Sequence, residues 1–370
     1  MVRRSAVCNL RDDVPLVMVI TDIGKDIDDA MALSILCYAD AVEKRIQILS
    51  VVANLKSAEL RANRVKGFLD SMGCPEVDVG TGTVGSSEDH FEREYEYDNV
   101  MRSDINFFQG GLSLMKSVLE RLRVSNRKAR VVCISSLRDI SELCEEDPQL
   151  VKSTIESFHI QGGVRVAPNG AGIVPSVDAS NNRFDMEAAT SFYSFVYNQS
   201  IKCTVCTKQA AFASKLPADL VSNLLSINGK VSMYMYRQIS EQMMIFYRQS
   251  CGPEPYAPYM DKEWWVRNIT VWYDENPGMP APEDEDILNY VRIPPYDVVA
   301  ALSAMGNVRD IFRYEPKRLL PAESTGEVYL MGGPPLGSSL HAEESVYAAG
   351  LLISQWLIRA VRWADTNVRV

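Results

Sequence analysis

Four aspartates lie within eight positions of one short segment of the chain. The segment is "VITDIGKDIDDAMAL", residues 19–33, and its acids are Asp22, Asp26, Asp28 and Asp29. Two unit charges about 4 Å apart repel by roughly 4 kcal/mol at an effective dielectric constant of 20, so this crowding is costly unless a cation neutralises it. Carboxylate oxygens are hard ligands that suit Ca²⁺ or Mg²⁺. The cluster predicts a divalent-cation site; the alternative is a helix start capped by Asp28, with Asp29 favouring the helix dipole and solvated loop charges around it.

A fifth aspartate, Asp297, offers a way to complete such a site from a distant part of the chain. It lies in "RIPPYDVVAALSAM", residues 292–305, at the start of an apolar helix after a proline-set turn. Alone, an acid in this position is more often a helix cap than a ligand. Together with the N-terminal cluster it could close a metal site from the opposite side. We therefore expect the carboxylate of Asp297 to lie within reach of that of Asp29.

The elements that must position these acids alternate between strands and helices over the first 210 residues. The run at 15–21 is continuously apolar, as expected of a strand covered on both faces. Further strands are predicted at 46–53, 76–80, 129–134, 158–163, 201–207 and 326–333, and helices at about 28–39, 57–72, 231–250 and 343–363. Strands separated by helices indicate crossover connections and a largely parallel sheet of an α/β protein. Ligands of such sheets bind at the carboxyl ends of the strands, which is where the first four aspartates lie.

Composition and charge restrict the class of protein. The chain has 370 residues, 46% of them hydrophobic, and we expect one domain over 1–370 with a helical C-terminal part. The net charge of −10 argues against nucleic-acid binding, which needs a basic face. No apolar run approaches the ~18 residues of a membrane span, and the first 13 residues lack the hydrophobic stretch of a secretory signal. A cytoplasmic protein with a small-molecule partner and no membrane partner is the resulting expectation.

The cysteines fit the same compartment. Eight are dispersed along the chain, which indicates reduced and mostly buried thiols rather than a disulfide scaffold. One pair, Cys203 and Cys206, has the C-x-x-C spacing but lies in a predicted strand with no second pair nearby. We expect these two thiols to be structural and not to bind metal or exchange disulfides.

Other catalytic motifs are absent or incomplete. Ser135 and Ser136 follow the fourth predicted strand without the Gly-x-Ser-x-Gly of a serine hydrolase. Phosphoryl transfer of the haloacid-dehalogenase type would require Asp-x-Asp at the strand end, whereas Asp22 is followed two positions later by Gly24. The three histidines are isolated and lack zinc-ligand spacing: His90, His159 and His341.

Together these motifs resemble the inosine–uridine-type nucleoside hydrolases. The family signature Asp-Thr-Asp-Pro-Gly-x-Asp-Asp appears here as "ITDIGKDIDD", with Ile20 at the first aspartate and two additional residues, Lys25 and Asp26, before the final pair. The ordered similarity extends over roughly 15–305 through four further segments: 49–82, 131–163, 180–189 and "YDVVAAL" at 296–302. The variant signature is also similar to that of the nucleoside-hydrolase-like effectors of plant-pathogenic bacteria. The resemblance implies a Rossmann-like α/β fold, a mostly parallel central sheet flanked by helices.

The resemblance also implies a Ca²⁺ cofactor and a hydrolytic mechanism. Asp22, Asp29 and Asp297, with the main-chain carbonyl of Ile134, would hold the ion, and Asp22 would take a proton from the attacking water. Asp28, Asn54 and Asn181 would bind the ribose hydroxyls. The full set of implied substrate-binding positions is Asp26, Asp28, Asn54, Gln161, Asp178 and Asn181.

Some positions depart from the family pattern. Ala179 stands where the family has the glutamate that binds the ribose 5′-hydroxyl, and the neighbouring Asp178 is the candidate substitute. Tyr296 replaces a late histidine; a phenol with a pKa near 10 is a weaker acid than imidazole, although it can donate a hydrogen bond or stack on a base. We list Tyr296 with Asp22 as catalytic candidates. Aromatic residues are candidates for a base-binding wall, with core packing as the alternative: Tyr247, Tyr256, Trp264 and Trp265.

Two functions remain open from the sequence. The first is a Ca²⁺-dependent N-ribohydrolase of purine or pyrimidine metabolism that cleaves the N-glycosidic bond of a nucleoside or related ribosyl compound. The second is a diverged protein of the same fold that binds a ribosyl ligand or a protein partner without turnover; Ala179, Tyr296 and the long segment 251–295 motivate it. A homo-oligomer is expected only because relatives commonly form one.

Overall fold

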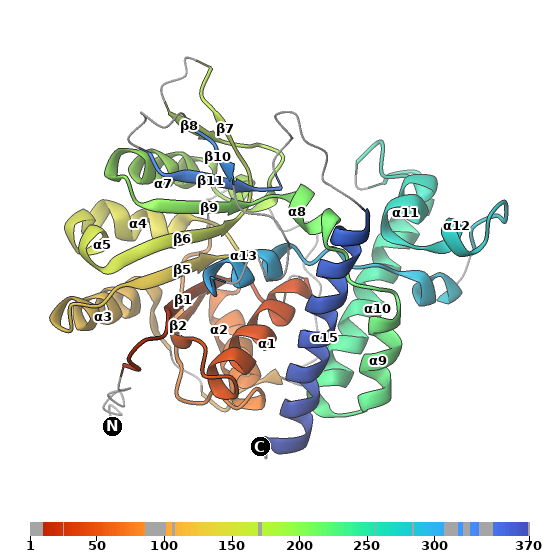
Figure 1. Ribbon diagram of the computed structural model, residues 1–370, viewed down its shortest axis with the longest axis horizontal. Coiled ribbons are helices and arrows are strands. Elements are labelled where there is room, and N and C mark those ends of the chain that lie inside the picture. The colour runs from red at the N-terminus through yellow and green to blue at the C-terminus, as the bar shows by residue number, and fades with distance from the viewer. Residues whose placement is uncertain are drawn as a thin grey trace.

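A nine-stranded sheet forms the centre of the computed structural model, which describes residues 10–24, 26–85, 101–105, 108–168, 172–255, 257–282, 285–306, 317–320, 326–332 and 343–368. The strand order is β10-β11-β9-β6-β5-β1-β2-β3-β4, and every adjacent pair is parallel except β10 with β11 (Figure 1). The strands are β1 (Leu16–Thr21), β2 (Gln47–Ala53), β3 (Asp78–Thr81), β4 (Gln109–Gly110), β5 (Ala129–Cys133), β6 (Ile155–Gln161), β9 (Lys202–Cys206), β10 (Lys317–Arg318) and β11 (Val328–Met331). The predicted α/β class with a mostly parallel sheet is confirmed.

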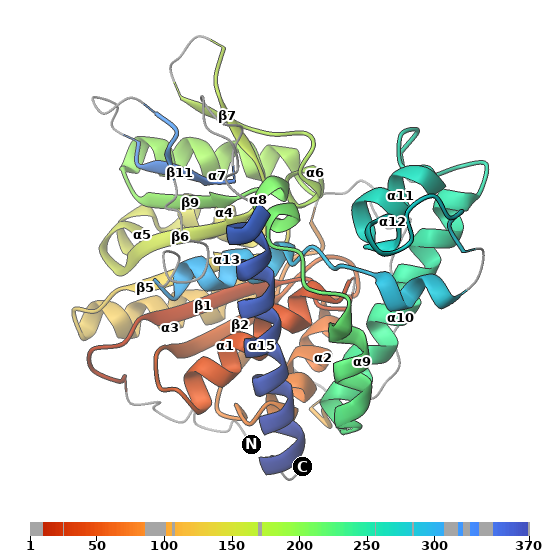
Figure 2. The same ribbon diagram turned by 45° about the vertical axis from the view of Figure 1, so that its right-hand side comes forward.

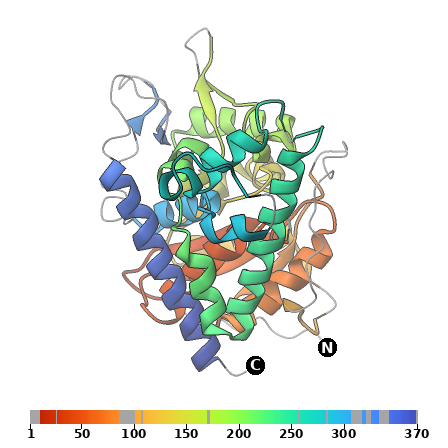
Figure 3. The same ribbon diagram turned by 90° about the vertical axis from the view of Figure 1, so that its right-hand side faces the viewer.

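Helices cover both faces of this sheet. One face is covered by α1 (Asp28–Ala41), α2 (Ala58–Ser71), α13 (Tyr296–Ala304) and α15 (Glu343–Asn367). These helices pack in one hydrophobic cluster, which also includes side chains of α9 (Asp219–Ile227), α10 (Lys230–Cys251) and α11 (Lys262–Ile269). The opposite face is covered by α3 (Gly111–Val124), α4 (Arg138–Glu146), α5 (Pro148–Thr154) and α7 (Met186–Gln199). A helical group stands beside the sheet: α9 (Asp219–Ile227), α10 (Lys230–Cys251), α11 (Lys262–Ile269), α12 (Trp272–Glu275) and the 3₁₀ helix η2 (Glu285–Tyr290) (Figures 2 and 3). The remaining elements are α6 (Ser180–Arg183), α8 (Lys208–Ala213) and the antiparallel pair β7 (Val164–Val166) and β8 (Ile173–Pro175).

The first strand shows why the apolar run is continuous. Val17 and Val19 point into the cluster on the α1 face, whereas Leu16, Met18 and Ile20 point into the cluster on the α3 face. Successive side chains of a strand face opposite ways, so a strand covered on both sides has to be apolar at every position. The predicted strands are all present, with shifts of a few residues at their ends.

Alternation also explains the C-x-x-C pair. Both thiols are free and buried in β9, but Cys203 lies in the cluster on the α3 face and Cys206 in the cluster on the α1 face. Residues three apart in a strand face opposite sides, so these thiols cannot chelate one ion. Among the described cysteines only Cys251 is exposed, and none forms a disulfide. Within the described part of the chain, no helix is both long and apolar enough to cross a membrane.

Two local expectations differ from the structure. Asp28 is the first residue of α1 and not its cap: the N-cap is Ile27, and no side chain caps the helix. The prediction that Asp28 caps the helix is therefore wrong, because the turn before α1 places an apolar side chain at the N-cap. The β7–β8 hairpin and the two-residue β4 were not predicted, since such short strands leave no alternating pattern to read.

A buried histidine connects the sheet to the helix that carries Asp297. His159 of β6 is 5% exposed, and its ring nitrogens lie 2.9 Å from Ser157 Oγ and 2.7 Å from Ser303 Oγ of α13. Ser303 Oγ donates to the carbonyl of Ala300, so it accepts from Nδ1–H and leaves Nε2 to accept from Ser157. Burial, with the nearby positive charge of Arg130, lowers the pKa of His159 to about 3.

We expect this imidazole to make stability pH-dependent. It stays neutral in the folded chain but is protonated below a pKa of about 6.5 when unfolded, so stability falls as the pH drops from 6.5 toward 3, at up to about 1.4 kcal/mol per pH unit. His159→Gln should be less stable at pH 7.5, yet its free energy of unfolding should change less between pH 6.5 and 4.5. Urea unfolding of both proteins across this range checks it, and parallel pH profiles would contradict it.

Candidate active site

Carboxylates from the two ends of the chain converge at one edge of the sheet. Asp26, Asp28, Asp29 and Asp297 each offer an oxygen, and these oxygens all lie within 4.8 Å of one another. Asp28, Asp29 and Asp297 are 8%, 0% and 4% exposed, and Asp26 is half-buried. The structure thus brings Asp297 within reach of Asp29 across more than two-thirds of the sequence. A group of hard oxygen donors at this spacing is suited to a cation.

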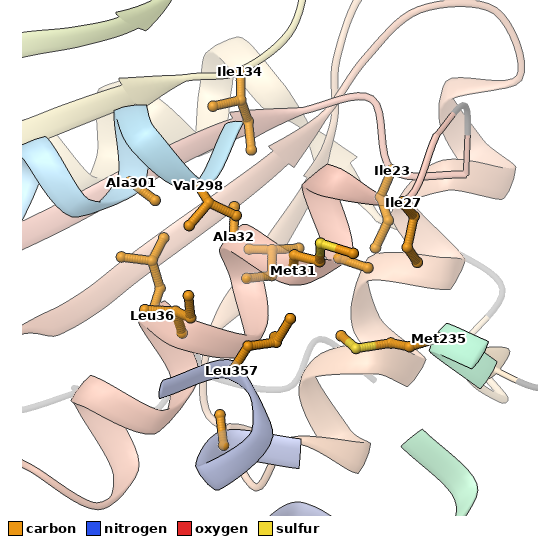
Figure 4. Close-up of a cluster of buried hydrophobic side chains, with 14 of the residues drawn as sticks. Ile23, Ile27, Met31, Ala32, Leu36, Ile134, Met235, Val298, Ala301 and Leu357 are labelled. Atoms are coloured by element: carbon orange, nitrogen blue, oxygen red, sulfur yellow. The ribbon is translucent and has the colours of Figure 1, made fainter. Parts of the chain in front are cut away.

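Helix packing sets this convergence. Asp28 and Asp29 lie in the first turn of α1, and Asp297 lies in the first turn of α13. The two helices pack against each other, with Ala32 of α1 beside Val298 of α13 in the apolar cluster (Figure 4). Ala32 and Val298 follow the acids of their helices by only a few residues. Their packing therefore holds the first turns of α1 and α13 next to each other. Their N-terminal dipoles favour negative charge at this point.

The two oxygens of the Asp29 carboxylate have different surroundings. Its Oδ1 accepts hydrogen bonds from Thr21 Oγ1 and from the backbone N–H of Asp22, the latter at 3.2 Å. Its Oδ2 is buried and has no hydrogen-bond partner among the described residues. A buried acceptor without a partner is rare and costly. An unpartnered carboxylate oxygen on a member of a group of four carboxylates fits a site that a cation completes.

Electrostatics in the cluster disfavours the ionised acids. Burial, followed by the charge of Asp26, raises the pKa of Asp28 well above its ordinary value. Burial and the charge of Asp22 raise the pKa of Asp29, and burial and the charge of Asp28 raise the pKa of Asp297. A cation bound among them reverses this balance, because it favours the charged form of every ligand. The cluster is therefore suited to hold either protons or a cation.

Asp22 is not a member of the group of four converging carboxylates. It is 3% exposed and follows β1, and its charge acts on Asp29. Its carbonyl accepts from Arg61 Nη1 at 2.5 Å. Ile134 follows β5, donates its N–H to the carbonyl of Ile20 at 2.9 Å, and directs its side chain into the apolar cluster (Figure 4).

The predicted substrate asparagine Asn54 is engaged by the protein. Its Nδ2 donates to the Ser136 carbonyl at 3.1 Å and to Asp139 Oδ2 at 2.8 Å, while its Oδ1 accepts from Ser135 Oγ. Asp139 also accepts from the backbone N–H of Thr83 at 2.8 Å. Both amide protons of Asn54 are committed, so it can offer a ligand only its carbonyl oxygen.

The other predicted site residues occupy different surroundings. Asn181 Nδ2 donates to Gln161 Oε1 at 2.7 Å, which joins α6 to the end of β6. Tyr296 precedes Asp297, is half-buried, and meets Phe212 edge-on with ring centroids 6.1 Å apart. Asp178 is exposed in the loop between β8 and α6, and its backbone N–H bonds to a serine at the same loop.

The aromatic candidates are divided between core and surface. Tyr247 and Trp265 are 2% and 0% exposed, with ring centroids 4.8 Å apart, and they belong to the hydrophobic core. Trp264 is partly buried and packs against that core. Tyr256, together with His90 and His341, lies outside the described residues.

Two residues at this edge were missed from the sequence. Arg61 of α2 is 1% exposed and donates to the carbonyls of Asp22, Ile23 and Lys56. Asp139 of α4 is 1% exposed and fixes the amide of Asn54. Arg61 falls within an ordinary amphipathic helix, and nothing in its spacing distinguishes it from a surface charge. Asp139 follows the Ser-Ser pair at the end of a strand, a signal that could have marked it.

Known structures share this architecture. No family model and no curated protein matches the chain. The type III effector protein XopQ, solved in complex with adenosine diphosphate ribose, is 21% identical over 95% of this chain and 96% of its own, with a TM-score of 0.79. The effector protein XOO4466 is also 21% identical over 95% of each chain, with a TM-score of 0.77.

Nucleoside hydrolases follow at a greater structural distance. The purine-preferring ribonucleoside hydrolase from Gardnerella vaginalis is 11% identical over 95% of this chain and 99% of its own, with a TM-score of 0.55. The two effectors thus superpose better than the hydrolase does over the same extent. The chain has the nucleoside-hydrolase-like fold, in the divergent form found in these effector proteins, as the variant signature predicted.

Proposed function

We propose that this protein is a Ca²⁺-dependent N-ribohydrolase that cleaves the N-glycosidic bond of a nucleoside or a related ribosyl compound. The observation that carries the proposal is the convergence of buried Asp29 and Asp297, with Asp29 Oδ2 lacking a hydrogen-bond partner in the described part of the chain. Ca²⁺ accepts six to eight oxygen ligands in flexible geometry, whereas Mg²⁺ retains several waters and seldom occupies an all-protein cage. A site with this many carboxylates therefore favours calcium.

The residues around the cation site have separate roles in the proposed hydrolysis. Asp29 and Asp297 would hold the ion, and the resemblance adds Asp22 and the carbonyl of Ile134 to them. A bound divalent cation would supply the positive charge that lowers the pKa of a water molecule. Asp22, whose backbone N–H donates to Asp29 and whose carbonyl accepts from Arg61, would act as the base that takes a proton from the attacking water.

The sugar is bound and stabilised by the same carboxylates. Asp28, the carbonyl oxygen of Asn54 and the Gln161–Asn181 pair bind ribose hydroxyls, and Asp178 at the exposed rim reaches the 5′ side. The water oxygen bonds to the anomeric carbon as the carbon–nitrogen bond breaks. The bonding electron pair leaves with the base, which takes up a proton, and the nearby acids stabilise the positive charge that develops on the sugar.

A second candidate function is binding of a ribosyl ligand without turnover. XopQ was solved with adenosine diphosphate ribose, and it superposes on this chain better than the hydrolases do. In addition, Tyr296 stands where a stronger acid would protonate the leaving base. The metal and ribose contacts are the same in both candidates, so turnover alone separates them.

A substrate panel tests the proposal. The calcium-loaded protein should release free base from at least one of purine nucleosides, pyrimidine nucleosides, cytokinin ribosides and ADP-ribose, as followed by chromatography. Tyr296→Phe should lower the rate for that substrate, by about 10-fold if its hydroxyl assists the leaving base. Calorimetric binding of a ribosyl compound that stays intact for hours across the whole panel would instead establish the second candidate.

Removing a central carboxylate should abolish the metal site. Asp29→Asn and Asp297→Asn are each expected to weaken Ca²⁺ binding by at least about 100-fold, equivalent to ~2.7 kcal/mol, because each removes a ligand and its charge. Calorimetry with CaCl₂ measures this, and circular dichroism checks that the variants are folded. Asp219→Asn, an exposed acid at the start of α9, is the matched charge control. Unchanged calcium affinity in a folded Asp29 or Asp297 variant would refute the site.

The stabilising effect of calcium should increase with pH. The cluster acids have raised pKa values when folded, so in metal-free protein their contribution to stability is present below their unfolded pKa and is lost as pH rises through the folded values. Calcium replaces the lost protons. The difference in melting temperature between CaCl₂ and chelator should grow from pH 5 to pH 8, and a difference independent of pH would contradict this account.

A further inference from the structure

We propose that Asp26 is a direct ligand of the metal ion, so that this chain binds its cation with one more carboxylate than the Asp22, Asp29 and Asp297 set supplies. The inference rests on the proposed cation site and assigns a role to Asp26, one of the two residues that lengthen the loop after β1. The loop is "DIGKDID", residues 22–28.

The carboxylate of Asp26 already lies in the ligand group. One of its oxygens is within 4.8 Å of the ligand oxygens of Asp28, Asp29 and Asp297, while Asp22 is not a member of that group. Asp29 Oδ2 is fully buried and has no hydrogen-bond partner among the described residues, while its Oδ1 is occupied by Thr21 and the Asp22 backbone, so Oδ2 is free to bind a cation. Asp26 is the half-buried member of the same group.

Both ends of the loop are anchored, which keeps Asp26 over the cluster. Ile23 and Ile27 are 1% and 2% exposed and lie close together in the apolar cluster (Figure 4). Arg61 Nη1 donates to the Ile23 carbonyl at 3.0 Å, and the N–H of Ile27 donates to Gln242 Oε1 of α10 at 3.1 Å. A ligand held in place before the ion arrives loses less conformational entropy on binding.

The turn between these anchors depends on a glycine. Gly24 has a φ of +97°, in the region that side chains rarely adopt, and a Cβ at this position would lie 2.5 Å from Arg64 Nη1. The chain can therefore reverse tightly after Ile23 and bring Asp26 back toward the first turn of α1. The longer loop serves to place a carboxylate rather than to fill space.

A fourth carboxylate has a consequence for the choice of ion. Ligand charge is one of the factors that set affinity in oxygen sites, and four carboxylates exceed the charge of a divalent ion. A trivalent ion such as Tb³⁺ uses the additional negative charge more fully than Ca²⁺ does. Losing the charge of Asp26 should therefore weaken Tb³⁺ binding more than Ca²⁺ binding.

Metal titrations of Asp26→Asn test the assignment. Asp26→Asn should weaken Ca²⁺ binding at least about 10-fold by calorimetry, and should weaken Tb³⁺ binding, followed by its luminescence, by a larger factor. Asp219→Asn, which removes an exposed acid outside the ligand group, should leave both affinities within about twofold. Because Asp26 is half-buried in a loop, the variant is expected to fold, and its melting temperature in chelator checks this.

The outcomes separate this inference from the proposed function. If Asp26→Asn binds both ions within about twofold of the parent while Asp29→Asn and Asp297→Asn lose them, Asp26 is not a ligand and the cation site stands. If the parent protein itself binds neither Ca²⁺ nor Tb³⁺, the proposed function and this inference both fail. Weakening in Asp26→Asn that is greater for Tb³⁺ establishes the assignment.

Discussion

Mutual repulsion of buried carboxylates is the constraint on which the rest of this structure depends. Four acids are held with their oxygens within 4.8 Å, three of them buried, and no charge on their own helices compensates them. The arrangement is imposed by the packing of α1 against α13 and by the anchoring of the loop after β1. The fold therefore holds the acids in an unfavourable arrangement that protons relieve, and that a bound cation would relieve as well.

Buried contacts connect the elements that carry the acidic cluster. The two hydrophobic clusters enclose β1 from both sides, and His159 fixes the far end of α13 to β6 through Ser303. Asp139 and Asn54 tie the ends of β2, β3 and β5 together at the same edge. These contacts spread the cost of the acidic site over many neighbours, so that a strained centre is compatible with a stable domain.

Among the solved structures compared, the effector proteins resemble this chain more than the hydrolase does. The effector proteins XopQ and XOO4466 superpose on the chain with TM-scores of 0.79 and 0.77, against 0.55 for a purine-preferring hydrolase. Fold alone does not determine activity, because chemistry depends on the site built upon the fold. The lengthened loop at Asp26 and the tyrosine at 296 are two of the positions where the sequence departs from the pattern of the hydrolases that it resembles.

The sequence by itself determined the class of fold and the acidic centre. Continuous apolar runs such as residues 15–21 reveal strands buried on both faces, and charges crowded after one of them mark the place where acids gather, because both signals are local. Tertiary structure alone decided that Asp26 and not Asp22 joins the converging group. It also decided that both amide protons of Asn54 bond to the protein and that Arg61 is buried against the backbone of the loop. Those outcomes depend on how side chains from separate elements meet, and that geometry leaves no periodic trace in the chain.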